Sequence, residues 1–104
     1  MIEKLQLHEG LHAETWYKDG DRSVAFVTLC GLGKRVINRK SDLTYEVLEG
    51  IGIFNVGDSC IRVVQAGEKI TIPAGTQYQD EGTLMMMVTS TPPFNEEGVI
   101  VLSD

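Results

Sequence analysis

The sequence predicts an all-β fold, and three observations support this expectation. Short apolar segments recur at spacings of roughly ten residues, and glycine, aspartate and proline interrupt them. The first clear segment, residues 23–29, alternates loosely and is rich in valine and phenylalanine, as strands are. Helical periodicity is hard to find. Many short strands at regular spacing are typical of a β-sandwich or a β-barrel.

Turn-forming residues separate the expected strands. Glycine tolerates positive φ in such turns, and proline fits the end of a strand because it cannot donate a ladder hydrogen bond. In chain order the expected strands cover residues 23–29, 43–48, 52–56, 60–64, 69–72, 83–90 and 99–102. The N-terminal segment 3–12 leaves two alternatives open, a short helix weakened by Gly10 or a strand. Trp16 and Tyr17 precede the first clear strand and could cover a barrel edge or a dimer surface.

Length, composition and charge narrow the class of protein. The 104 residues suit one domain, 1–104, and 42% of them are hydrophobic. The formal net charge of −6 disfavours nucleic acid and anionic membranes as partners. The basic residues of segment 34–40 form too short a group to change this expectation. The sequence shows no apolar signal core or membrane-spanning run, so we expect a cytoplasmic protein.

The two cysteines, Cys30 and Cys60, are expected to be free thiols. Both lie in apolar segments, where free cysteine packs as a small hydrophobic residue, so we expect them to be buried. They form no cluster with histidine at zinc-binding spacing. His8 and His12 would share one face if the N-terminal segment were helical, but two histidines without a third ligand are expected to be surface residues.

The segment 31–82 resembles the two sequence motifs of the cupin superfamily. Gly31 and Gly50 fit the end glycines of the first motif, and Gly67, Pro73 and Gly75 fit the second motif without gaps. Residues 91–94, with the sequence Thr-Pro-Pro-Phe, resemble the tail of many small single-domain cupins. The resemblance implies a cupin-type double-stranded β-helix, also called a jelly-roll barrel.

The resemblance also implies that the metal ligands of the family are replaced. The histidine, histidine, glutamate and histidine of the motifs fall on Ile37, Arg39, Leu43 and Tyr78. Aliphatic side chains cannot coordinate a metal, a guanidinium repels a cation, and a phenol keeps its proton at neutral pH. A shift of the first motif by one residue brings Val36 and Asn38 to the histidine positions, which is no better. We therefore expect no metal and no cofactor.

The inward positions of the family predict a pocket with apolar walls and a few polar groups. Alternation along a strand places every second residue inside a barrel. The expected pocket residues are Ile37, Arg39, Leu43, Tyr45, Val47 and Tyr78. In this pocket Arg39 would hold a carboxylate or phosphate in a fork, and the two tyrosines would stack on a ring or donate hydrogen bonds. One or more of Met85–Met87 should face inward and pack in the core.

Three functional hypotheses follow. The leading one is a metal-independent, small-molecule-binding cupin that acts as a sensor or carrier, with a carboxylate, phosphate or sugar-like ligand. The second is a metal-independent sugar epimerase or isomerase, although the histidine base of such relatives has no counterpart in the predicted barrel. The third is a dimeric structural or interaction module, which would pair through the first dozen residues and the segment 92–94. We expect a homodimer in each case, and the sequence shows no complete catalytic constellation.

Overall fold

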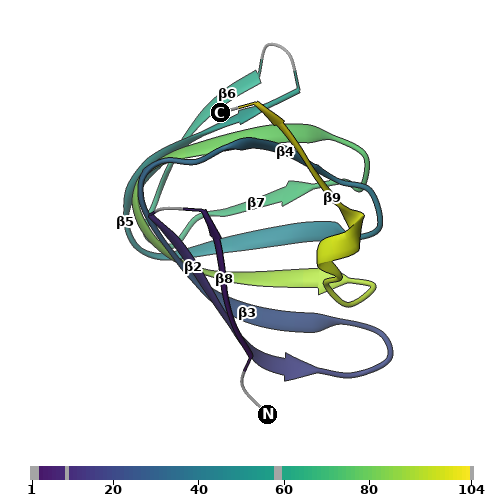
Figure 1. Ribbon diagram of the computed structural model, residues 1–104. Coiled ribbons are helices and arrows are strands. Elements are labelled where there is room, and N and C mark those ends of the chain that lie inside the picture. The colour runs from purple at the N-terminus through teal and green to yellow at the C-terminus, as the bar shows by residue number, and fades with distance from the viewer. Residues whose placement is uncertain (1–2, 9, 58–59, 104) are drawn as a thin grey trace.

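Nine strands form one strongly curved antiparallel sheet in the computed structural model, which describes residues 3–8, 10–57 and 60–103 and the side chains of 10–57 and 60–102. The long strands curve so that β4 and β9 face β2 and β3 across the interior (Figure 1). A single 3-10 turn, η1 (Glu96–Gly98), precedes the last strand. The strands are β1 (Glu3–His8), β2 (Leu11–Lys18), β3 (Ser23–Leu32), β4 (Arg35–Asn38), β5 (Asp42–Val56), β6 (Cys60–Gln65), β7 (Lys69–Ile72), β8 (Gln77–Thr91) and β9 (Val99–Ser103).

Strand β8 joins the two halves of the barrel. One of its edges pairs with β3 from Ser23↔Ser90 to Leu32↔Glu81, and then with β4 through Val36↔Tyr78. Its other edge pairs with β5 along nearly its whole length. One face of β8 therefore points into the barrel interior along the whole strand. The even-numbered residues are on this face and are buried from Tyr78 to Ser90, except for the half-buried Gly82.

Strand β5 changes its inward parity at a β-bulge. Its register with β8 shifts between Val47 and Glu49, so that the exposed Leu48 is the extra residue. Before the bulge the odd-numbered residues point inward, and after it the even-numbered ones do, Phe54 among them. The backbone N–H and C=O of Val47 bond to Glu68 and Gly67 in the turn between β6 and β7. The two strands expected at 43–48 and 52–56 are thus one bent strand, since a bulge bends a strand without ending it.

Glycines permit the sharp bend next to this bulge. Gly82 lies opposite Gly31 on one side and Gly52 on the other, and its φ is 131°. A Cβ on Gly82 would lie 2.6 Å from the Ile51 carbonyl oxygen, closer than any side chain tolerates. The turn glycines expected from the motifs also have positive φ, namely Gly31, Gly50, Gly67 and Gly75.

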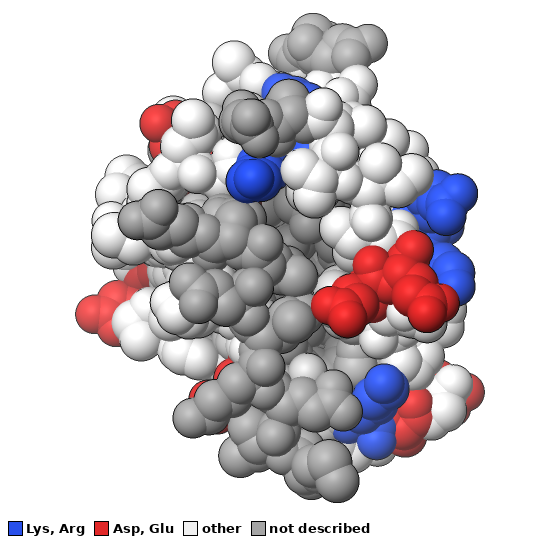
Figure 2. All heavy atoms as spheres, viewed as in Figure 1, with Lys and Arg blue, Asp and Glu red and all other residues white. Residues whose placement is uncertain are grey.

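The core fills one end of the barrel with apolar side chains. Phe54, Val64 and Met86 are fully buried, which confirms that one of the three consecutive methionines packs inward. Outside the barrel, β5 and β6 carry exposed apolar side chains, among them Ile51 and Val63. On the face shown in Figure 2, acidic and basic side chains form small groups, some of which adjoin one another.

The structure corrects two expectations about the first half of the chain. Residues 3–8 and 11–18 form the β1–β2 hairpin, so the helical alternative for the N-terminal segment is wrong and the strand alternative holds. Cys30 and Cys60 are free, but they are exposed rather than buried, because Cys30 has the outward parity of β3 and Cys60 begins β6, far from the one buried residue of that strand. Trp16 is part of β2 and stacks on Phe26 of β3 with a centroid distance of 5.2 Å. None of the described helical segments is long and apolar enough to cross a membrane.

We predict that Gly82→Ala destabilises the protein by about 3 kcal/mol or more, because the new Cβ meets backbone atoms and the backbone must leave its present φ. Urea denaturation checks this expectation. Gly20→Ala is the matched control, since a Cβ there meets nothing within 4 Å and its φ is not positive. Equal stability of the two variants would contradict the account of the bend.

Candidate functional site

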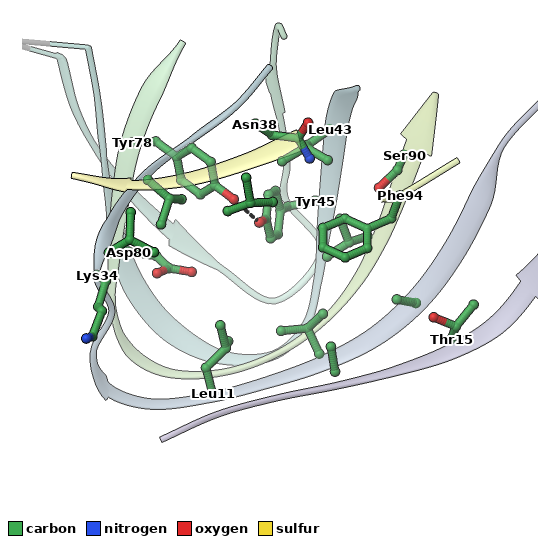
Figure 3. A pocket seen from close by; sticks show the side chains of 17 residues that line it. Leu11, Thr15, Lys34, Asn38, Leu43, Tyr45, Tyr78, Asp80, Ser90 and Phe94 are labelled. Atoms are coloured by element: carbon green, nitrogen blue, oxygen red, sulfur yellow. Dashed lines mark hydrogen bonds between the residues drawn. The ribbon is translucent and has the colours of Figure 1, made fainter. Parts of the chain in front are cut away.

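The other end of the barrel holds a cavity of about 150 Å³, room for roughly five water molecules. Its walls are mainly apolar, and most of its polar side chains converge from β4, β5 and β8 (Figure 3). The lining residues are Leu11, Ala13 and Thr15 of β2, Ala25 and Val27 of β3, Lys34, Val36 and Asn38 at and before β4, Leu43 and Tyr45 of β5, Tyr78, Asp80, Val88 and Ser90 of β8, Phe94, and Val99 and Val101 of β9. Apolar walls with a few converging polar groups are the usual composition of a small-molecule site.

A pair of buried tyrosines lies at the centre of this cavity. The hydroxyl oxygens of Tyr45 and Tyr78 are 2.7 Å apart, a hydrogen bond in which either can be the donor (Figure 3). Only one hydroxyl hydrogen can lie between the two oxygens, so the second is available to another acceptor. Phe54 packs against both rings, with centroid distances of 5.0 Å to Tyr45 and 6.4 Å to Tyr78. This packing fixes both rings, and with them the direction of the hydroxyls.

Burial keeps both phenols in the neutral state. It raises the pKa of Tyr45 well above the ordinary value, and the neighbouring Tyr78 and Asp80 raise this pKa further. Burial likewise raises the pKa of Tyr78, although the hydrogen bond from Tyr45 opposes this effect. At physiological pH the pair is therefore a hydrogen-bond donor and acceptor and carries no charge.

Asp80 is the acidic side chain that lines the cavity, and it is only 6% exposed. It lies two residues beyond Tyr78 on the same face of β8, so both side chains enter the cavity. A Cβ on Gly33 would overlap the Asp80 carboxylate, so the glycine leaves the space that the carboxylate occupies. The Gly33 N–H donates to the Asp80 carbonyl oxygen at 2.7 Å, which ties the segment before β4 to β8.

The segment after β8 supplies the remaining wall. The Phe94 N–H donates to Ser23 Oγ at 2.9 Å, and the Ser41 hydroxyl donates to the Pro92 carbonyl oxygen at 2.8 Å. These bonds hold residues 92–94 beside the cavity and place the Phe94 ring in its lining. The tail motif recognised in the sequence is thus part of the site.

The structure brings together three of the six residues predicted for the pocket. Leu43, Tyr45 and Tyr78 line the cavity, but their role in ligand binding stays a prediction. Val47 is buried in the core beyond the cavity lining. Ile37 is half-buried and Arg39 is exposed, and neither lines the cavity.

The two cavity-facing positions predicted at Ile37 and Arg39 must each be moved back by one residue. On β4 the cavity-facing side chains are Val36 and Asn38, so the inward positions carried over from the family motif, Ile37 and Arg39, were wrong by one residue. The fork that we expected Arg39 to offer to a carboxylate or phosphate is therefore not in the cavity. The first motif agrees with this register if its histidine positions are at residues 36 and 38. Four residues, 39–42, then separate the second histidine position from Leu43, one more than in the motif.

Sequence reasoning missed Asp80, Lys34 and Phe94 as cavity residues. Alternation beyond Tyr78 on β8 would have found Asp80, because residues 78 and 80 share a face. Lys34 appeared only as part of a short basic group in a presumed turn. The tail motif 91–94 includes Phe94 but does not place it in the cavity, because its place depends on hydrogen bonds to residues more than fifty positions away in sequence.

The side chains around the cavity suit hydrogen bonding better than metal coordination. In the observed register, the family's four ligand positions hold Val36, Asn38, Leu43 and Tyr78. These four side chains form a poor donor set for a divalent ion. Within the described residues, no three His, Cys, Asp or Glu side chains lie close enough to hold a metal ion. Asp80 can accept hydrogen bonds and the neutral tyrosine pair can donate one, which suits the binding of hydroxyl and carbonyl groups.

Comparisons with known proteins agree with the fold. No protein-family model matches the sequence, and no curated protein matches it. Solved structures do match. PAC13 of Streptomyces with uridine superposes with a TM-score of 0.88 at 26% sequence identity, over 98% of this chain and 84% of that chain. The PAC13 structures with uridine are single-substitution variants, two with phenylalanine in place of tyrosine and one with glutamine in place of histidine.

More distant structures show the same architecture. An RmlC-like cupin of Shewanella frigidimarina has a TM-score of 0.75 at 20% identity, over 88% of this chain and 84% of that chain. Ectoine synthase of P. lautus has a TM-score of 0.79 at 13% identity, over 95% and 80% of the two chains. The chain therefore has the cupin-type β-barrel fold that its motifs predicted.

We predict that stability falls at high pH because of the buried tyrosines. In the unfolded chain these phenols ionise near pH 10, whereas in the folded protein their pKa is raised. The free energy of unfolding should be unaffected by these groups below pH 10 and should then fall, by about 1.4 kcal/mol per tyrosine between pH 9 and pH 11. Urea denaturation across this range measures the slope.

The Tyr78→Phe variant should have the shallower slope because it has one less buried phenol. Trp16→Phe is the control, since Trp16 is an exposed aromatic side chain with no ionisable group. If Tyr78→Phe shows the same slope as the native protein, the neutral, buried state of this phenol is contradicted.

Proposed function

We propose that this protein binds a nucleoside, or a closely similar small molecule with a polar ring and hydroxyl groups, in the cavity of its barrel. The observation that carries the proposal is the buried Tyr45–Tyr78 pair, which has a hydroxyl hydrogen to offer inside a mainly apolar cavity. Buried polar groups are normally satisfied by a partner, and the most direct partner here is a ligand. The Asp80 carboxylate beside the pair adds an acceptor for ligand hydroxyls.

The choice of a nucleoside rests on the resemblance to PAC13. That protein is described as a nucleoside dehydratase, and its structures contain uridine. Two of its uridine structures replace a tyrosine, and the present chain has two tyrosines in its cavity. A sequence identity of 26% over nearly the whole chain supports a ligand of the same class.

Binding in this cavity is proposed to be independent of a metal. The support is the chemistry of the lining. At the positions of the family's metal ligands it has an amide, a phenol and two aliphatic side chains, and elsewhere it has hydroxyl, ammonium and carboxylate groups. Such groups can bind hydroxyls and carbonyls directly. Reversible binding of this kind suits a sensor or a carrier.

Isothermal titration calorimetry with uridine tests the proposal. We expect one molecule bound per chain, and an affinity about three- to tenfold lower for Tyr78→Phe, because one hydrogen bond to the ligand is lost. Ala25→Phe should abolish binding, since its ring enters the cavity from β3.

Tyr17→Phe serves as the control because Tyr17 is an exposed tyrosine outside the cavity lining. Its affinity should equal that of the native protein. Undetectable binding of uridine to the native protein at millimolar concentration, or equal affinity of Ala25→Phe, would overturn the proposal.

A further inference from the structure

The orientation of the Asn38 side chain is fixed by its own turn. Asn38 Oδ1 accepts hydrogen bonds from the backbone N–H groups of Lys40 at 3.0 Å and Ser41 at 2.9 Å. A flipped amide would place its NH₂ group against two N–H donors, which is electrostatically unfavourable. The oxygen must therefore face the turn, and Nδ2 must face away from it.

Nδ2 is a buried donor with no hydrogen-bond partner within the described part of the chain. Asn38 is only 4% exposed, and its side chain lies in the cavity wall beside Leu43, with the amide nitrogen on the cavity side (Figure 3). An unsatisfied buried donor costs about 1–3 kcal/mol, which a ligand acceptor would offset. Asn55 Oδ1 is also buried and unpaired, but Asn55 does not line the cavity.

The cavity places different chemistry at its two ends. Asp80 is an acceptor, and in Figure 3 it lies across the cavity from Asn38, with the two tyrosine hydroxyls between them. A carboxylate binds hydroxyl groups, such as those of a ribose, whereas an amide NH₂ binds a carbonyl oxygen. In a pyrimidine nucleoside the carbonyl at position 4 is on the ring edge farthest from the sugar. A ribose at Asp80 therefore directs position 4 of the base toward Asn38.

We propose that Asn38 is the residue that selects the base, through a hydrogen bond from Nδ2 to the 4-carbonyl of a uracil-type ring. This inference rests on the proposed function and adds to it the class of ring that is recognised. Uracil has an acceptor oxygen at position 4, whereas cytosine has an amino group that donates. An amide donor held rigidly by its turn favours the first ring and is left unsatisfied by the second. We expect the native protein to bind uridine at least tenfold more tightly than cytidine.

The decisive variant is Asn38→Asp. Its carboxylate keeps an oxygen for the N–H groups of Lys40 and Ser41, because aspartate and asparagine stabilise such turns equally. It replaces the donor in the cavity by an acceptor. Calorimetry with uridine and cytidine should show the affinity ratio shifted by at least tenfold toward cytidine. Asn38→Ser, which is too short to reach the ligand, should lose the preference for uridine without gaining one for cytidine.

Arg39→Ala is the matched control next to Asn38. The Arg39 side chain is exposed and outside the cavity lining, and its removal leaves Nδ2 in place, so the ratio of affinities should stay as in the native protein. If Asn38→Asp and Asn38→Ser bind uridine with the native preference, the role of Asn38 is overturned while the proposed function stands. If the native protein binds neither nucleoside, both are overturned.

Discussion

The rest of the structure depends on the pairing of β8 with β3 and β4 on one edge and with β5 on the other. Because the side-chain period of a strand is two, this double pairing determines which residues of three neighbouring strands enter the interior. Tyr78 and Asp80 face the cavity, and Leu84 and Met86 face the core, as members of one alternating series. A slip of one residue would turn the phenol and the carboxylate to solvent and bring Gln79 and Glu81 inside.

The bulge at Leu48 and the three paired glycines Gly31, Gly82 and Gly52 allow the long strands to bend, so that the sheet can curl into a barrel. The bulge lets β5 place Tyr45 in the cavity at one end and Phe54 in the core at the other, although 45 and 54 have opposite parity. The glycines allow β5 and β8 to bend together at the same level. As a result, Phe54 packs against Tyr45 and Tyr78 and fixes the hydroxyl pair. The features that close the barrel are therefore the same features that orient the polar groups of the site.

The fold could be predicted from the sequence more completely than the residues of the site. Strand β7 was predicted at its observed bounds, and the motif glycines lie at positive φ, because a turn depends on local residues. The short strand β4 was missed, since its neighbours are distant in sequence and basic residues flank it. Arg39 was chosen in place of Asn38 because the histidine positions of the family motif were carried over with no predicted strand to check their parity. Tyr78 was placed in the cavity from the last histidine position of the motifs, and Tyr45 from the alternation that continues from Leu43.

The central claim is that the polar groups converging in this barrel form a binding site for a nucleoside. A crystal structure of the native protein grown with a saturating concentration of uridine tests this claim most directly. The account predicts electron density for one uridine in the cavity, with its ribose hydroxyls at Asp80, its base toward Asn38 and a contact to the tyrosine hydroxyls. Density for uridine only on the outer surface of the sheet, with the cavity holding water alone, would contradict it.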